Sequence, residues 1–584
     1  MNLPFSPREL VGLAVVSMLA TNVVGCSGDK VPGGDSDIAT DTIADTGDIV
    51  EEVADSDASP VAPVLEQVRI TGSAATVLAF SLSLETDLAT TAEVTVTPSE
   101  GEPWLVSTVG DAQTTHDLVI AGLHASTTYS LSIAATGADG GQVVDDSKSI
   151  TTDPLPETLP PLEVVTSSPD RMAPGFTLFN VFQWLPGAQG PDLETGWLIA
   201  LDADGRVVWY VQTSGRPEDV RVLSSGNIGY TSGDDGFVEM DALGHVVRRW
   251  VATALDDSPP EGAIGVDLDG MHHEVFELPN GNLLTLSPEL REIGTDTCPG
   301  YGETLNVVGE EVVELDPETG DIVQRASLFD SLDPCRRMDH GFEAGFWDQR
   351  YGGVTTQDWI HGNAVVYDAA RGLAIVSSRH QDWLIALEWT PGDTAATTHE
   401  IAWLLGDEGS AGDYGDHDAF TPTGTPFAWS YHQHAPQVLD NGNILLFDNG
   451  NLRPGTDYDA DDAEGDADLP YSRAVEYAID TTAWTISQAW EWIPEVDGVR
   501  QYTPYIGDAD QLSNGNVLVT VGGLVAPKTE ILGDTAVKKS ARIVEVARDG
   551  SDDVVFDVRL EDEADTDFTG YAVYRSERIT GFLR

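Results

Sequence analysis

The feature that most constrains the fold is a phrase that recurs from about residue 165 onward. It consists of an apolar residue, a turn of the form x-Asn/Ser-Gly-Asn, and an apolar strand. Asn and Gly both tolerate positive φ, so the phrase predicts a β-hairpin. The copies are VLSSGNIGY (222–230), ELPNGNLLTL (277–286), VLDNGNILLF (438–447), QLSNGNVLVT (511–520) and the weaker VYDAARGLAIVS (366–377).

Each copy leads into a second hairpin, for example FVEMDALGHVVRRW (237–250), VVELDPETGDIVQ (312–324) and IVEVARDGSDDVVFDV (543–558). Two consecutive hairpins make a four-stranded sheet, and five such units can be recognised. A sixth is expected to combine residues 197–211 with the C-terminal residues 570–579. The sequence therefore predicts an all-β fold, with a six-bladed β-propeller over residues 165–584 that closes by joining its two ends.

A different pattern precedes the repeats. Short alternating runs separated by Gly, Ser and Asp turns fill residues 64–155 and predict a small β-sandwich. The segment Leu123–Tyr129 resembles the loop of a fibronectin type III domain, with Tyr129 in the place of its corner tyrosine. We therefore expect a fibronectin type III/Ig-like module before the propeller.

The N-terminal residues 1–26 have the order of an export signal. Arg8 is followed by an apolar stretch, Leu10 to Ala20, and then by Val-Val-Gly-Cys, which resembles a bacterial lipobox. Cleavage there would leave Cys26 as the lipidated first residue, and the acidic residues 27–63 read as a disordered tether. The pattern predicts an exported lipoprotein at the periplasmic face or surface of the outer membrane.

Charge and cysteine content narrow the possible partners. The formal net charge of −69 repels phosphate backbones, which argues against nucleic-acid binding and requires a local basic cluster for any anionic substrate. Apart from Cys26 the chain contains only Cys298 and Cys335. In an oxidising compartment such a pair is more readily a disulfide than a metal site, although the separation does not show that the two residues meet.

Three histidines share one position of the repeat. His273, His361 and His434 stand seven residues before Asn280, Asp368 and Asn441 of their turns. Glu218 and Gly507 occupy the same position in other copies. Inner strands of a propeller line its axis, so side chains in one register can converge at one mouth of the channel. The alternative explanation is that the three histidines descend from one duplicated blade. However, Glu218 and Gly507 at the same position make the set asymmetric, as expected of a catalytic site.

Two further polar residues lie near these histidines in the sequence. Asn363 follows His361 by two residues, and Arg379 lies on the next strand within IVSSRHQDWLIALEW. An arginine in an apolar strand needs an anion, either a neighbouring carboxylate or an oxyanion of a substrate. The nearby histidines favour the substrate.

Four phrases together resemble a known family. MHHEVFELPNGNLLTL, DWIHGNAVVYD, SSRHQDWLIALEW and YHQHAPQVLDNGNILLFDNGNLR are similar to the core of bacterial arylsulfate sulfotransferases, over roughly residues 170 to 584. The resemblance implies a six-bladed propeller that transfers a sulfuryl group from a phenolic ester to a phenol through a sulfohistidine, without a nucleotide sulfate donor or another cofactor. It also implies a possible homodimer.

The resemblance assigns roles to individual residues. It implies that His434 is the nucleophile and that His273, His361, Asn363 and Arg379 surround the sulfuryl group. Thr503 is the nearest counterpart of a substrate-binding threonine of the family, although Gly507 and Asp508 occupy the aligned turn.

Two alternatives of other classes remain at the level of the sequence. One is a non-catalytic, surface-anchored propeller that binds glycans or proteins, for which a cluster of histidines and arginine is unnecessary. The other is a metal-dependent hydrolase that uses His273, His432 and His434, since imidazoles are good ligands for Zn and Cu. His272 adjoins His273 and is expected to face the opposite way along the strand.

Overall fold

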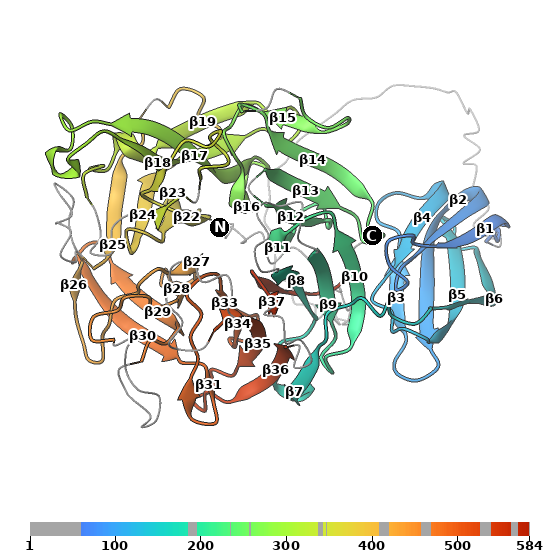
Figure 1. The fold of residues 1–584 in the computed structure, drawn as a ribbon. Coiled ribbons are helices and arrows are strands. Elements are labelled where there is room, and N and C mark those ends of the chain that lie inside the picture. Colours follow the sequence, from blue (N-terminus) through green and yellow to red (C-terminus); the bar gives the residue numbers. More distant parts are fainter. Residues whose placement is uncertain are drawn as a thin grey trace, which may run out of the picture.

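The computed structural model describes residues 60–184, 196–233, 235–255, 258–336, 343–345, 347–396, 398–407, 420–456, 469–525, 539–561 and 570–582. The predicted leader with Cys26, and most of the predicted tether, lie outside these residues. Within them a small β-sandwich lies beside a ring of six sheets (Figure 1). The predicted fold class, a six-bladed propeller preceded by a sandwich, is confirmed. No helix in the described part of the chain is long and apolar enough to cross a membrane.

The sandwich is built around one long strand, β2. The first half of β2 pairs with β1 and β4, and its second half pairs with β3 and β5, so the two halves belong to different layers. Tyr129 lies at the start of β5, and its hydroxyl accepts a hydrogen bond from the His124 backbone N–H at 2.7 Å, as in a tyrosine corner. The strands are β1 (Leu65–Gly72), β2 (Phe80–Pro98), β3 (Trp104–Ser107), β4 (Gln113–Ile120), β5 (Thr128–Gly137) and β6 (Gln142–Thr151).

The first three sheets of the ring follow one another along the chain. The first contains β8 (Phe176–Trp184), β9 (Gly196–Leu201) and β10 (Val207–Thr213), and the second β11 (Pro217–Val222), β12 (Ile228–Ser232), β13 (Gly236–Met240), β14 (Val246–Ala252) and β15 (Ile264–Val266). The third contains β16 (His272–Glu277), β17 (Leu283–Ile293), β18 (Leu305–Leu315), β19 (Ile322–Ser327), β20 (Glu343–Ala344) and β21 (Gln357–Asp358).

The remaining sheets complete the ring. The fourth contains β22 (Gly362–Asp368), β23 (Leu373–Ser378), β24 (Trp383–Glu388) and β25 (Ile401–Gly406), and the fifth β26 (Thr421–Pro422), β27 (His434–Val438), β28 (Ile444–Asp448), β29 (Arg473–Asp480) and β30 (Thr485–Trp492). The sixth contains β33 (Asp508–Gln511), β34 (Val517–Leu524), β35 (Ser540–Val546) and β36 (Val554–Leu560). A separate hairpin joins β31 (Glu495–Val496) to β32 (Val499–Arg500), and short 3-10 helices are η2 (Pro169–Arg171), η4 (Pro299–Tyr301) and η5 (Leu328–Asp330).

Both ends of the propeller sequence contribute to closing the ring. The N-terminal strand β7 (Glu163–Ser167) pairs with the outer strand β36, whereas the C-terminal strands β37 (Gly570–Ala572) and β38 (Ser576–Ile579) pair with β8 on its inner side (Figure 1). The predicted sixth unit, which combined residues 197–211 with 570–579, is therefore present. Closure in this way leaves no open edge between the first and last sheets.

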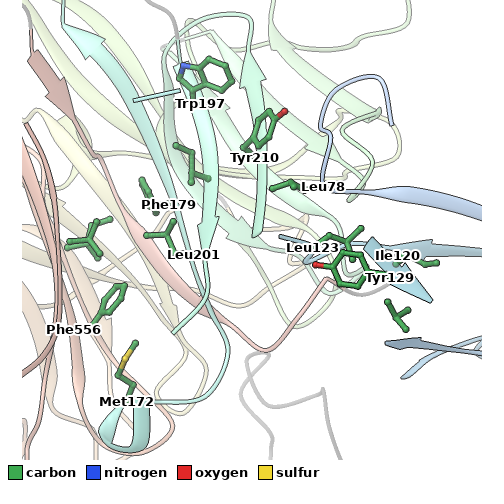
Figure 2. Close-up of a cluster of buried hydrophobic side chains, with 14 of the residues drawn as sticks. Leu78, Ile120, Leu123, Tyr129, Met172, Phe179, Trp197, Leu201, Tyr210 and Phe556 are labelled. Carbon is green, nitrogen blue, oxygen red and sulfur yellow. The ribbon is translucent and has the colours of Figure 1, made fainter. Parts of the chain in front are cut away.

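The sandwich packs against the first sheet of the propeller. Figure 2 shows Leu78, Leu123 and Tyr129 of the sandwich approaching Tyr210 and Leu201 of the ring, within one buried apolar cluster. Three hydrogen bonds border this interface. His124 Nε2 lies 2.8 Å from Asp202 Oδ2, Ser73 Oγ donates to the Leu243 carbonyl at 2.6 Å, and the Val77 N–H donates to Tyr210 Oη at 3.3 Å.

The tyrosine corner provides a test of the sandwich. Replacement of Tyr129 by Phe leaves the partly buried His124 N–H without its acceptor, and we expect a loss of about 1 to 2 kcal/mol in the free energy of unfolding. Thr128→Val, which removes an exposed hydroxyl bonded to Thr151, should cost less than about 0.5 kcal/mol. Thermal and urea denaturation of the two variants measure the difference, and equal effects would contradict the assigned role of Tyr129.

Candidate active site

The site begins where the inner strands are irregular. The pairing of each of the strands β11, β16, β22 and β27 with its neighbour shifts register near its start, which is the mark of a β-bulge. His273 and His361 have positive φ angles of 62° and 46°, and Gly507 at the same repeat position has 122°. A non-glycine residue with positive φ is uncommon and often marks a functional site. The bulges turn these side chains out of the regular alternation.

The predicted residues from three sheets meet at these bulges. The rings of His273 and His361 lie 5.3 Å apart, centroid to centroid. The amide Nδ2 of Asn363 donates at 2.8 Å to the backbone carbonyl of Gln433, the residue before His434. The backbone N–H of Arg379 donates to the His361 carbonyl at 3.1 Å. These contacts tie the starts of β22 and β27 together around one group of side chains.

The protonation of His434 is determined by Asn449. The Asn449 amide Nδ2 donates to the carbonyl oxygens of Thr503 and Ile506, both at 2.8 Å, so its Oδ1 must act as an acceptor. His434 Nδ1 lies 2.6 Å from this Oδ1 and therefore carries the hydrogen. The other ring nitrogen, Nε2, then has a lone pair, and it accepts from the Ile506 N–H at 3.2 Å.

Electrostatics reinforce this neutral state. Burial, and next the positive charge of Arg379, lower the pKa of His434 from 6.5 to about 3. The hydrogen bond to Asn449 acts in the opposite direction but does not outweigh burial and the charge of Arg379. At neutral pH His434 is an uncharged imidazole whose Nε2 carries a lone pair, which is the protonation state that a nucleophile requires once the hydrogen bond from the Ile506 N–H is released.

His361 has a different partner. Its Nδ1 lies 2.6 Å from Asp358 Oδ2, and Asp358 is buried. A carboxylate in this position orients the ring and can stabilise a positive charge that forms on it. His361 is thus arranged to hold and release a proton at Nε2, in contrast to His434.

Arg379 is held by its neighbour. His380 Nδ1 lies 2.9 Å from the Asp358 carbonyl, which can only accept, so His380 Nε2 is the acceptor for the Arg379 guanidinium at 2.7 Å. A second guanidinium nitrogen donates to the Pro504 carbonyl at 3.2 Å. These two contacts hold the guanidinium in a fixed position beside His380 and Pro504.

Thr503 lies behind the site. Its hydroxyl donates to the Tyr505 carbonyl at 2.8 Å and accepts from the Gly523 N–H at 3.0 Å, and its carbonyl accepts from Asn449. In this arrangement it supports the loop that carries Ile506. Its predicted contact with substrate stays a prediction.

The C-terminal strand inserts a second guanidinium. Arg575 lies between β37 and β38, buried, with Asp219 at 3.2 Å and Glu274 at 2.9 Å. Burial opposes the charge, but Glu274 and Asp219 raise the pKa of Arg575 well above its usual range. The neighbouring Tyr574 ring lies 6.0 Å from the His273 ring.

His272 differs from the prediction. The alternation of a strand would turn it away from His273, but the two Nδ1 atoms lie 2.7 Å apart. The positive φ of His273 breaks the alternation and brings consecutive rings into contact. His272 Nε2 in turn lies 3.1 Å from Glu310 Oε2.

We do not assign a metal site. Among the described residues the ligating atoms of Asp358, His361 and His380 lie within 4.8 Å of one another. However, two ligands on one ion at about 2.1 Å each sit roughly 3 Å or more apart, and the 2.6 Å between Asp358 and His361 fits a hydrogen bond instead. The predicted trio of His273, His432 and His434 does not form such a group in the described part of the chain.

The cysteine pair is bonded. Cys298 and Cys335 form a disulfide with a Cα–Cα distance of 5.3 Å, which confirms that the two residues meet. The bond anchors the segment that leads to Arg336, whose guanidinium lies over the Trp383 ring at 3.6 Å.

Sequence reasoning missed the residues that orient the site. Asp358 stands three residues before His361, and Asn449 lies in FDNGN, so both were visible within the phrases that were compared. Tyr574 and Arg575 were assigned only to a closing strand. A charged residue and an aromatic residue in the strand that closes a propeller at its axis are the signal that could have found them.

Fold and site together define a class: a β-propeller protein with a buried, histidine-centred site for an anionic group. The model of the arylsulfotransferase (ASST) family matches residues 162–572, and the chain belongs to this family. It is 24% identical over 371 residues to arylsulfate sulfotransferase AssT of Escherichia coli O6:H1, covering 56% of this chain and 57% of that protein.

A second relative gives a similar result. The arylsulfate sulfotransferase AssT of Lelliottia amnigena is 24% identical over 304 residues, covering 46% of this chain and 45% of that protein. The chain thus spans about half the length of the curated relatives it matches. A solved periplasmic gluconolactonase, PpgL of Pseudomonas aeruginosa, aligns with a TM-score of 0.28 at 10% identity, over 68% of this chain and 100% of that one.

The pKa of His434 predicts a pH dependence of stability. Folding lowers this pKa from 6.5 to about 3. Between these two pH values the imidazole of His434 is protonated in the unfolded chain and unprotonated in the folded chain. The contribution of His434 to the free energy of unfolding is complete above 6.5 and falls as the pH drops toward 3. We expect His434→Asn to lose stability less steeply between about pH 7 and pH 4, measured by urea denaturation.

The control for this comparison is His245→Asn, the loss of one imidazole at the exposed surface. If wild type and His434→Asn lose stability in parallel over the window, the assigned pKa of His434 is wrong.

Proposed function

We propose that this protein is an arylsulfate sulfotransferase that moves a sulfuryl group from a phenolic sulfate ester to a phenol through a sulfohistidine on His434, without a nucleotide donor. The observation that carries the proposal is the Nε2 lone pair of His434: Asn449 holds the hydrogen on Nδ1, and burial together with the charge of Arg379 keeps Nε2 unprotonated. A neutral nucleophile beside a fixed positive charge suits attack on an anionic sulfate ester.

In the first half-reaction, His434 Nε2 attacks the sulfur atom of the donor. The S–N bond forms while the S–O bond to the phenol breaks. Arg379 stabilises the negative charge on the sulfuryl oxygens, and the His361 ring, oriented by Asp358, donates its Nε2 proton to the departing phenolate. The phenol leaves and the sulfuryl group remains on His434.

The second half-reaction reverses the first with another phenol. The acceptor hydroxyl gives its proton to His361 Nε2, its oxygen attacks the sulfur, and the electron pair of the broken S–N bond returns to His434 Nε2. Because the two halves differ only in the phenol, microscopic reversibility requires one group to act as both acid and base. His361 is that group, since it alone of the three aligned histidines has a direct carboxylate partner among the described contacts.

An aromatic cluster next to the nucleophile suits an aryl substrate. Phe182, Tyr505, Ile506 and Tyr574 pack together, and Ile506 is the residue whose N–H contacts His434 Nε2. Aromatic rings bind preferentially against such surfaces, by stacked and edge-to-face contacts. We propose this cluster as the binding surface for the phenol ring, with Asn363 and Thr503 supporting the acceptor side.

We also propose export and a lipid anchor at Cys26. The Cys298–Cys335 disulfide supports an oxidising compartment, since structural disulfides are rare where thiols are kept reduced. Radiolabelled palmitate, incorporated into wild type and not into Cys26→Ser, tests the anchor. The location at the outer membrane and the homodimer remain predictions.

The proposed reaction is tested with p-nitrophenyl sulfate, with and without an added phenol. We expect release of p-nitrophenol that depends on the acceptor, with the sulfate found on the acceptor. His434→Ala should lower turnover by at least about 10³-fold, because loss of a nucleophile removes the covalent route. His245→Ala, at the exposed surface, is the matched control and should retain wild-type turnover.

Each of the other classes gives a different result. Equal release with water alone identifies a sulfatase, loss of activity on chelation and recovery with a metal identify a metal-dependent enzyme, and no release identifies a binding protein. Full activity of His434→Ala would move the nucleophile elsewhere.

Asn449 provides a separate test of the assigned nucleophile. Asn449→Asp places a carboxylate on His434 Nδ1, which favours the imidazolium and should raise the pKa of His434 by about 1 to 3 units from its value of about 3. The acid limb of kcat/KM should therefore move to higher pH, while activity near neutral pH is less affected. An unchanged acid limb in a folded Asn449→Asp protein would mean that His434 does not need to be neutral.

A further inference from the structure

Three buried groups form a chain that ends at the site. Glu310 on β18 contacts His272 Nε2 at 3.1 Å, and His272 contacts His273 through their two Nδ1 atoms at 2.7 Å. Glu310 and His272 are fully buried, and His273 is 7% exposed. The mechanism proposed above uses neither Glu310 nor His272.

We propose that Glu310 and His272 hold a proton behind His273 and so make His273 Nε2 a hydrogen-bond donor to the sulfuryl oxygens. This inference rests on the proposed sulfuryl transfer and deepens it. His273 would touch the substrate, whereas His272 and Glu310 are positioning residues that act through it.

The geometry limits the possible arrangements of protons. Burial raises the pKa of Glu310, and the neighbouring His272 opposes this rise. As a carboxylate Glu310 only accepts, so the His272 Nε2 that faces it then carries a hydrogen. The short contact between the two Nδ1 atoms holds one hydrogen. If His273 carries it and is neutral, His273 Nε2 is bare and repels sulfuryl oxygens. If His272 carries it, His272 is a cation beside Glu310, and neutral His273 presents Nε2–H to the site.

The surroundings explain why the charge belongs on His272. Burial, and next the neighbouring imidazole of His272, lower the pKa of His273 well below its usual value, so that a positive charge on His273 itself is unfavourable. Transfer of the hydrogen to His272 places the charge against Glu310 instead. The positive charge on His272 then compensates the buried carboxylate of Glu310. At the same time His273 keeps its hydrogen on Nε2, where it can donate to a group in the site.

Rigid contacts hold the chain in place. The second oxygen of Glu310 accepts from the Gly362 N–H at 3.0 Å, and the Trp347 ring lies 5.2 Å from the His272 ring. Among the described residues, the titratable and charged groups that face the chain include His361, His434, Arg216 and Tyr574 on the side of His273, and Asp358 and Tyr351 on the side of Glu310.

The carboxylate should extend the activity toward high pH. With Glu310 present, the His272–His273 pair keeps its additional proton to a higher pH than an uncharged partner would allow. In Glu310→Gln this proton is lost at lower pH. The alkaline limb of kcat/KM for p-nitrophenyl sulfate should therefore shift to lower pH by about one unit or more. Below that limb we expect kcat within about threefold of wild type.

Glu314→Gln is the matched control. Glu314 lies four residues further along β18, is equally buried, and accepts from Asn280, Gln324 and the Trp389 indole N–H, away from the histidines. It should lose stability, as Glu310→Gln does, while its pH profile follows that of wild type. A Glu310→Gln profile that superimposes on wild type, or one reduced by the same factor at every pH, would overturn the proposal.

A measurement on the unmodified protein avoids dependence on a variant that fails to fold. In ¹⁵N-histidine NMR spectra, His273 Nε2 should lose its proton over the pH range of the alkaline limb, and no such change would also overturn the proposal. If wild type itself releases no p-nitrophenol, the proposed function fails. If wild type is active and neither change is seen, only the inference about Glu310 and His272 fails.

Discussion

Closure of the propeller requires that the buried positive charge of Arg575, in the C-terminal segment, is paired with carboxylates of other sheets. Arg575 lies between β37 and β38, and its backbone N–H donates to Asn180 Oδ1 at 2.9 Å. Its guanidinium forms ion pairs with Asp219 and Glu274 from two other sheets. An isolated buried guanidinium would be strongly unfavourable, so closure of the ring and pairing of this charge occur together. The C-terminal strand thus joins three sheets at the place where the histidines converge.

The three aligned histidines share a position but differ in their Nδ1 partners. His434 faces an amide oxygen, His361 a carboxylate, and His273 another imidazole. An amide leaves the ring neutral, a carboxylate stabilises a charge on it, and an imidazole can exchange a hydrogen with it. In the reaction we propose, one repeated residue type therefore supplies a nucleophile, an acid–base group and a donor, because neighbouring strands differ.

Much of the fold was predictable because its signals are local. Asn-Gly turns at fixed spacing define the hairpins, and His273, His361 and His434 lie at or directly before the starts of the inner strands β16, β22 and β27. The prediction for His272 was wrong because it assumed regular alternation, which the positive φ of His273 interrupts. Asp358 and Asn449 were overlooked because their importance lies in contacts with ring nitrogens, and no spacing in the sequence reports which atom a side chain reaches.

The sequence by itself determined the repeat, the sheets and the residue types that face the axis, since turns and strand periodicity depend on neighbours along the chain. The tertiary structure alone decided the protonation of each imidazole. Hydrogen-bond partners such as Asn449 for His434 and Glu310 for His272 come from other strands, and burial changes the balance between charged and neutral forms. The chemistry of the site therefore arises only when the ring is closed.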